Sequence, residues 1–274
     1  MLCWNKEIAK QMKSSLDKLC LCCGSKSVKN KLTFDVADIF ICHNSCIFSK
    51  PKVDTNSLYT PDYFKNNYEE LKAEQAKALK ITTHILKKYI KSGSILDYGC
   101  GIGAFLQIAE KNGFLDNIGI DISNYSTSIA QSVTTDSNFF NDKDLLSSRR
   151  FDCISFLDSL AHIDDANEVF SGLIRNNLKP DGIILIRTPN INRAYLTYVL
   201  LLKYLLPKKY LRSYLFIPNR FFLFNKKSIN LFLEKHNMQV QEYFLEPDIK
   251  NDSSKFINSF SIKTIVDYIL RIKI

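Results

Sequence analysis

The stretch from residue 94 to residue 121 constrains the fold more than any other part of the sequence. An apolar run ends in Asp97 and is followed by three alternate glycines at positions 99, 101 and 103. A helix-like segment comes next, and a second apolar run closes on Asp121. Strand, glycine turn, helix and strand in this order predict the start of a parallel α/β sheet, with a ligand held at the turn.

The two acids in this stretch narrow the chemistry of that ligand. Asp121 ends the second strand, where an acidic side chain can accept the hydroxyls of a ribose. The glycine spacing is G-x-G-x-G, whereas dinucleotide-binding turns have G-x-G-x-x-G. Asp97 would repel a pyrophosphate but would suit an ammonium group. The free N–H groups at the following helix N-terminus favour a carboxylate.

Strand-like and helix-like runs alternate through the rest of the chain, which predicts a mostly parallel, doubly wound sheet. The predicted strands are Ile95–Tyr98, Ile118–Asp121, Thr134–Phe139, Asp152–Leu157, Ile183–Arg187 and Gln239–Leu245. The predicted helices cover residues 103–112, 124–132, 164–176 and 226–236.

Three segments together resemble the class I S-adenosylmethionine-dependent methyltransferases. The first is the segment from Ile95 to Asp121, which contains Asp97, the glycine turn and the second predicted strand. The second, Phe151-Asp-Cys-Ile-Ser-Phe-Leu-Asp-Ser-Leu-Ala-His, resembles the fourth-strand motif of that family. The third, Leu178-Lys-Pro-Asp-Gly, resembles its L-K-P-G-G turn, with Asp181 in place of the first glycine, and runs on to Thr-Pro-Asn. The resemblance covers residues 95–190 and implies a Rossmann-like fold with methyltransferase activity.

The resemblance also implies roles for individual residues. Asp97 should face the amino group of the methionine moiety, and Asp121 should hold the ribose. The residues expected to line the cofactor are Gly99, Gly101, Gly103 and Ile122. The adenine loop should lie at residues 138–142, with either Asp142 or Asp144 as its acid, and Asp158 should position the cofactor or the loop.

His162 is the candidate catalytic residue. It follows the fourth strand, at the rim where open α/β sheets bind ligands, and neutral imidazole has a suitable pKa range for a general base. The alternative is a loop histidine that orders the site through backbone hydrogen bonds.

The acceptor is predicted to be a small molecule, methylated on a hydroxyl or a carbon. The fourth strand does not end in the Asn/Asp-Pro-Pro-aromatic sequence of base N-methylation or in a Pro-Cys nucleophile. A sugar or a lipid-linked glycan precursor is therefore favoured. The alternatives are an RNA methyltransferase, suggested by the net charge of +9, and a non-catalytic Rossmann-like binding module. The lysines are dispersed and form no basic stripe with stacking aromatics, which argues against nucleic acid.

The first 57 residues hold six of the eight cysteines. Cys20 and Cys23 form a C-x-x-C-G knuckle, and Cys46 pairs with either His43 or Cys42 about twenty residues later. Four N or S ligands from two knuckles suit a structural tetrahedral zinc ion, and the favoured set is Cys20, Cys23, His43 and Cys46. The segment resembles the zinc-binding N-terminus of some bacterial sugar and surface-polysaccharide methyltransferases, in which an aromatic stretch like Leu58-Tyr-Thr-Pro-Asp-Tyr-Phe also follows.

The chain is predicted to have four parts: a zinc-binding module (1–57), a connecting helix (58–94), the methyltransferase core (95–245) and a tail (246–274). Residues 191–225 form an insertion in the core, either a lid over the substrate or a surface that meets a membrane. Residues 261–274 are expected to form a short basic amphipathic helix. The N-terminus has no signal-peptide pattern, which predicts a cytoplasmic protein, with peripheral membrane contact through residues 194–224 as an added hypothesis.

Overall fold

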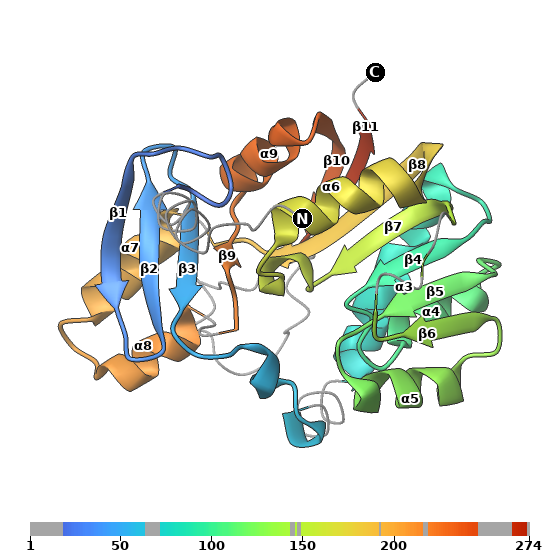
Figure 1. The fold of residues 1–274 in the computed structure, drawn as a ribbon, viewed down its shortest axis with the longest axis horizontal. Coiled ribbons are helices and arrows are strands. Elements are labelled where there is room, and N and C mark those ends of the chain that lie inside the picture. The colour runs from blue at the N-terminus through green and yellow to red at the C-terminus, as the bar shows by residue number, and fades with distance from the viewer. Residues whose placement is uncertain are drawn as a thin grey trace, which may run out of the picture. The chain divides into compact units, whose positions relative to one another are not determined.

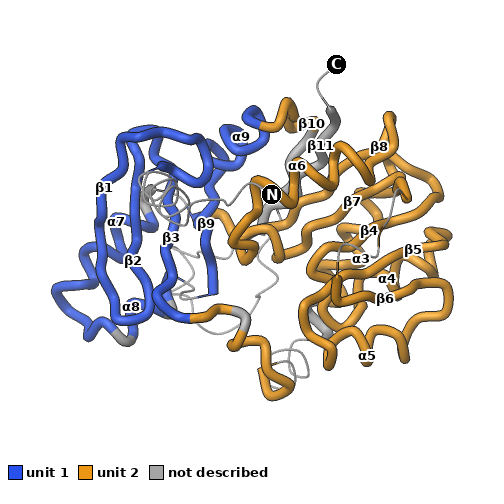
Figure 2. Tube along the Cα trace, viewed as in Figure 1, with its two compact units in different colours: residues 1–53, 191–235 blue, residues 54–190, 236–274 orange. Residues whose placement is uncertain are grey.

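The computed structural model describes residues 19–63, 72–142, 146, 149–191, 193–215, 219–245 and 265–272. The chain divides into two compact units, coloured separately in Figure 2. Unit 1 combines residues 1–53 with residues 191–235, and unit 2 combines residues 54–190 with residues 236–274.

Unit 2 contains a seven-stranded sheet in the order β10-β11-β8-β7-β4-β5-β6 (Figure 1). Its strands are β4 (Ile95–Tyr98), β5 (Asn117–Ile120), β6 (Ser137–Phe140), β7 (Phe151–Leu157), β8 (Leu178–Pro189), β10 (Met238–Leu245) and β11 (Ile265–Ile272). Strands β8, β7, β4, β5 and β6 are mutually parallel. The central strands are mostly apolar because both of their faces are buried, which confirms the predicted doubly wound α/β fold.

Helices cover both faces of this sheet. On one face, α3 (Lys72–Tyr89) and α4 (Ala104–Glu110) share a core cluster with Ile95, Cys153 and Leu185 from the strands. On the other face, Phe156 of β7 meets Phe170 of α6 (Ala166–Asn177), with ring centroids 5.6 Å apart. Successive residues of a strand point to opposite faces, so Cys153 and Phe156 must contact different helices. Helix α5 (Asn124–Val133) connects β5 to β6.

Residues 265–272 form the strand β11, so the predicted amphipathic helix over residues 261–274 was wrong for this part of the chain. β11 runs antiparallel to both of its neighbours, β8 and β10, and lies between them in the sheet. β8 is also longer than predicted, because the expected turn at residues 178–182 is part of the strand and Leu178 pairs with Phe151 of β7.

Unit 1 is built around a four-stranded antiparallel sheet in the order β1-β2-β3-β9. Its strands are β1 (Val28–Thr33), β2 (Ala37–Cys42), β3 (Ile47–Pro51) and β9 (Phe222–Leu223), and its helices are α7 (Arg193–Leu202), α8 (Lys208–Tyr214) and α9 (Lys226–Lys235). The expected insertion therefore does not belong to the core. It supplies the fourth strand of the N-terminal sheet, and α9 packs there through Phe232 on Phe222 and Phe224.

Among the described residues, the structure has no helix with the length and apolar character needed to cross a membrane.

Candidate functional site

The glycine turn after β4 adopts a backbone that other residues rarely take. Gly99, Gly101 and Gly103 have φ values of 81°, 51° and 76°. A Cβ at Gly99 would lie 2.3 Å from the Cβ of Ser159, and one at Gly103 would lie 2.8 Å from that of Ala130. Left-handed backbone and close neighbours together require glycine at the first and third positions.

Asp121 holds this turn against the next helix. One of its carboxylate oxygens accepts a hydrogen bond from the Gly101 amide (2.9 Å). The other accepts from the Ser123 amide (3.0 Å) and the Ser126 hydroxyl (3.1 Å) at the start of α5. The carboxylate is therefore oriented before any ligand arrives, and it faces the pocket described below.

Asp97 lies deeper than Asp121 and is only 2% exposed. Burial raises its pKa from 3.8 to about 7, although the hydrogen bond from Ser155 (2.7 Å) and the charge of Arg187 act in the opposite direction. A carboxyl group that is expensive to ionise gains most from a cation beside it.

The loops at the carboxyl ends of β4, β5, β6 and β7 enclose a pocket of about 400 Å³ within unit 2. The carboxyl edge of an open parallel sheet is the usual place for a ligand. Five carboxylates and three tyrosines are among its walls, which comprise Tyr59, Tyr63, Tyr98, Gly99, Ile120, Asp121, Ile122, Asn141, Asp142, Leu157, Asp158, Ser159, His162, Ile163, Asp164 and Asp165.

Most of the predicted cofactor residues meet at this pocket. Gly99, Asp121, Ile122, Asp142 and Asp158 line it, and Ile122 is 55% exposed. The alternative adenine-loop acid at position 144 lies outside the described residues.

Asp158 stands in a strained backbone conformation, with φ at 60°. Its carboxylate pairs with the Arg187 guanidinium at 3.1 Å, and its amide donates to the Arg187 carbonyl at 2.9 Å. Both bonds run to β8, so Asp158 is placed to fix the loop after β7. Strain of this kind costs on the order of 1–3 kcal/mol and is typically kept at functional sites.

His162 lines the same pocket from the short 3-10 helix η3 (Leu160–His162). Its Nδ1 lies 2.9 Å from the hydroxyl oxygen of Tyr59. Tyr63 packs edge-on against Tyr59, with ring centroids 5.4 Å apart. Both tyrosines come from the aromatic stretch before α3. The sequence pattern there predicts a connecting helix and gives no sign of the contact with the pocket.

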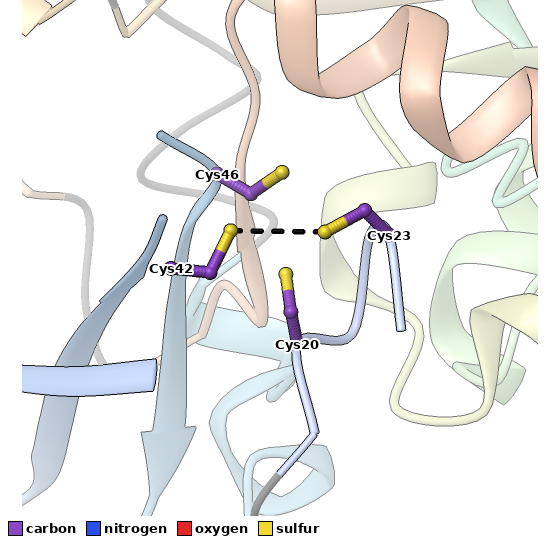
Figure 3. A group of neighbouring side chains, drawn as sticks. All are labelled: Cys20, Cys23, Cys42 and Cys46. Atoms are coloured by element: carbon purple, nitrogen blue, oxygen red, sulfur yellow. Dashed lines mark hydrogen bonds between the residues drawn. The ribbon is translucent and has the colours of Figure 1, made fainter. Parts of the chain in front are cut away.

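A second cluster of functional side chains lies in unit 1. The sulfur atoms of Cys20, Cys23, Cys42 and Cys46 all lie within 4.8 Å of one another (Figure 3). Cys20 and Cys23 come from the turn before β1, where the Gly24 amide donates to the Cys20 carbonyl (2.8 Å). Cys42 ends β2, and Cys46 stands just before β3. Hydrogen bonds from the neighbouring thiols of Cys22 and Cys46 lower the pKa of Cys20.

Cys42 completes this cluster, and the expected member His43 does not. Nδ1 of His43 lies 2.8 Å from the hydroxyl oxygen of Ser25. No metal-ligating group that includes His43 occurs among the described residues. The hairpin end explains the choice: residues 42 and 46 bracket a tight turn in which the Ser45 amide donates to the Cys42 carbonyl (2.9 Å). Their sulfurs therefore meet, whereas His43 lies in the turn itself and its ring is bonded to Ser25.

Comparison with known structures identifies the same fold in several methyltransferases. One neighbour is a 1,6-didemethyltoxoflavin-N1-methyltransferase from Burkholderia thailandensis, with bound 1,6-didemethyltoxoflavin and S-adenosylhomocysteine. It is 14% identical with a TM-score of 0.55, and the match covers 90% of this chain and 100% of that one. Another is the magnesium protoporphyrin IX methyltransferase from Synechocystis PCC 6803 with bound S-adenosylmethionine, at 13% identity, TM-score 0.52, and 81% and 98% coverage.

A protein from Pyrococcus horikoshii OT3 is 22% identical with a TM-score of 0.55, and the match covers 78% of this chain and all of that one. At these identities the likeness concerns the fold alone. No curated protein matches the sequence significantly. The model of the methyltransferase domain family matches residues 69–243, which is more than half of the chain and includes the glycine turn, Asp121 and His162. The chain therefore belongs to the methyltransferase domain family.

Proposed function

We propose that this protein transfers a methyl group from S-adenosylmethionine to a hydroxyl or a carbon of a small, sugar-like molecule. The observation that carries the proposal is that one pocket contains both the predicted cofactor-binding residues and the candidate catalytic histidine. Asp121 and Gly99 of the glycine turn form its cofactor end, and His162 with Tyr59 forms another part of its wall. Methyl transfer depends mainly on holding two reactants in line, and a shared pocket provides that arrangement.

At the cofactor end, each group suits one part of S-adenosylmethionine. The oriented carboxylate of Asp121 would accept the ribose hydroxyls, and the buried carboxyl of Asp97 would pair with the methionine ammonium. The exposed side chain of Ile122 offers an apolar surface to the adenine, beside Asp142. The turn at Gly99 lets the backbone approach the ligand without a side chain between them.

The acceptor end is polar, aromatic and acidic. Tyr59, Tyr63 and His162 line it together with Asp164 and Asp165. Carboxylates and phenols hydrogen-bond to hydroxyl groups, and aromatic rings pack on the C–H face of a sugar ring. The same carboxylates repel phosphate, which argues against an RNA backbone in this pocket. The intact glycine turn argues against a non-catalytic binding module.

The proposed reaction assigns a proton to His162. The acceptor oxygen attacks the sulfonium methyl carbon, the carbon–sulfur bond breaks, and the electron pair stays on sulfur as a thioether. The acceptor hydroxyl loses its proton to Nε2 of His162, because Nδ1 is already bonded to the Tyr59 hydroxyl. Tyr59 is then a positioning residue that holds the imidazole in one orientation.

A turnover screen with methyl-labelled S-adenosylmethionine tests this function. Neutral sugars, nucleotide sugars, glycolipids and RNA are offered in parallel, and label should enter a sugar-containing acceptor. The Asp121→Ala variant is the control, because it removes the ribose contact and leaves the acceptor wall intact. Label that enters only RNA, or no cofactor binding by calorimetry, would contradict the proposal.

We also propose that the four-cysteine cluster binds a structural zinc ion. A tetrahedral site with zinc–sulfur bonds of about 2.3 Å places its sulfur atoms roughly 3.8 Å apart. The sulfurs of Cys23 and Cys42 are 3.7 Å apart, and the Asn44 side-chain amide lies 3.5 Å from Cys23 as a donor to that sulfur. Zinc would stabilise unit 1 by joining the turn before β1 to the β2–β3 hairpin.

Elemental analysis of the purified protein tests the metal site. We expect about one zinc per chain, a number set by one four-sulfur cluster. Cys42→Ser should lose the metal and lower the melting temperature, whereas His43→Ala should retain it. Zinc lost from the histidine variant and kept in the cysteine variant would show that the other ligand set is correct.

A further inference from the structure

The turn that joins α7 to α8 exposes an unusual number of large apolar side chains. Leu201, Tyr204, Leu205 and Tyr210 are 60%, 77%, 78% and 52% exposed, all within ten residues. We call residues 201–210 the α7–α8 tip, which lies at the edge of unit 1 in Figure 1. The other large apolar side chains that are exposed among the described residues are scattered singly.

This exposure is not left over from an incomplete core. Leu196 and Val199 of α7, Leu211 of α8 and Leu215 directly after α8 are almost completely buried, so each helix already has an inner face. The tip is the part of the hairpin that projects beyond that packing. Contiguous apolar surface outside a satisfied core is typical of an interaction site, since leaving it in water is unfavourable.

The segment of the chain that contains the tip carries only positive charges. From Gly182 to Leu233 the sequence has no aspartate or glutamate and nine lysines and arginines, as many as the net charge of the whole chain. Lys203 and Lys208 are exposed in the tip itself, and the Lys203 ammonium lies 4.8 Å from the centre of the Tyr204 ring. Arg212 is bound to Asp35 at 3.3 Å and adds less to this field.

We propose that the α7–α8 tip docks on an anionic lipid bilayer, with its leucines in the acyl boundary and its tyrosines and lysines among the headgroups. Tyrosine and lysine combine an apolar body with a polar end, which fits the interface of a membrane. Each lysine near such a surface adds attraction to anionic lipid. The inference stands apart from the proposed methyl transfer, because it concerns unit 1 and requires no turnover.

Two other partners fit the tip less well. A second copy of this chain would bring Lys203 and Lys208 of two tips close together, and their like charges would repel. RNA would satisfy the lysines and could stack on the tyrosines, but it offers no apolar place for Leu201 and Leu205.

Sedimentation of the full chain with vesicles tests the proposal. The protein should bind vesicles that contain phosphatidylglycerol and should stay in solution with pure phosphatidylcholine. Tyr204→Ser combined with Leu205→Ser should weaken binding at least about tenfold. Leu115→Ser combined with Val133→Ser, which alters exposed apolar residues elsewhere, should bind like the wild type.

A charge variant and two competing assays complete the test. Lys203→Gln should weaken binding to anionic vesicles roughly fivefold, and added salt should do the same. Equal binding to neutral vesicles, or none to either kind, would overturn the proposal. The proposal would also be overturned if the Tyr204/Leu205 variant binds vesicles like the wild type but loses either concentration-dependent dimers or RNA binding that the wild type shows. Each readout is binding, so the result holds whether or not methyl transfer is found.

Discussion

Replacing Asp97 by asparagine should stabilise the cofactor-free protein at pH 8 while it weakens binding of S-adenosylmethionine. Burial raises the pKa of Asp97 from 3.8 to about 7, so the folded protein must ionise a carboxyl group that is 2% exposed. Asparagine has nearly the same shape, and its side-chain oxygen can still accept the hydrogen bond from Ser155. The substitution therefore removes the ionisation penalty and leaves the packing in place.

The size of the effect follows from the two pKa values. Each pKa unit is worth about 1.4 kcal/mol, so a rise of roughly three units costs about 4 kcal/mol at pH 8. The pKa of the folded state is the higher one, so the folded protein binds more protons between about pH 4 and pH 7 and loses stability as the pH rises through that window. At pH 5 only about 2 kcal/mol of the penalty is present. The stability gap between variant and wild type should widen by about 2–3 kcal/mol from pH 5 to pH 8.

Urea unfolding at the two pH values, without cofactor, measures this gap, and calorimetry at pH 8 measures the loss of cofactor affinity. Asp152→Asn is a control, because its effect on stability should have the opposite sign to that of Asp97→Asn. Burial raises the pKa of Asp152, but its hydrogen bonds to Lys179 and Ser94 outweigh burial and lower the pKa overall. That variant should lose stability at pH 8. Parallel pH profiles for the wild type and the Asp97 variant, or an unchanged cofactor affinity, would refute the reasoning.

Three further predictions concern the pocket. His162→Ala should reduce turnover about 100-fold in single-turnover kinetics, with little change in cofactor affinity. Tyr59→Phe removes one 2.9 Å hydrogen bond and should reduce turnover roughly tenfold. If cofactor affinity falls together with turnover, His162 orders the loop and does not act as the base. Asp121→Ala should weaken cofactor binding by about 1.5–3 kcal/mol in calorimetry, the range for hydrogen bonds to a charged group. Gly99→Ala should lower the free energy of unfolding by more than about 2 kcal/mol. Gly113 has a similar φ but open space around it, so Gly113→Ala should lower it by only about 1 kcal/mol in the same assay. Equal losses would show that backbone strain, and not the contact with Ser159, causes the loss.

The core was predictable because its signals are local. The apolar run, the alternate glycines and Asp121 lie within one strand–turn–helix–strand unit, and the backbone requirement at Gly99 is visible in the sequence itself. The carboxyl ends of neighbouring parallel strands always meet at one edge. The positions of Asp121, Asp158 and His162 around one pocket follow from that rule.

The features that sequence analysis missed depend on contacts between distant residues. Tyr59 meets His162 across 103 positions, and nothing near either residue indicates the other. β9 is two residues long and completes a sheet whose other strands lie more than 170 positions earlier. Whether Cys42 or His43 joins the cysteine cluster depends on the register of the β2–β3 hairpin. The spacing of residues in the sequence does not fix that register to within one residue.

The position of β11 has a consequence for how the chain folds during synthesis. β10 is paired only with β11 among the described strands, and β11 lies between β10 and β8. Neither β8 nor β10 can therefore gain this partner until β11 has left the ribosome. Until then β8 presents an unpaired, strongly apolar edge, which is the kind of edge that invites aggregation. Expression of a shortened chain that stops after residue 245 should therefore depend on chaperones far more than expression of the full chain.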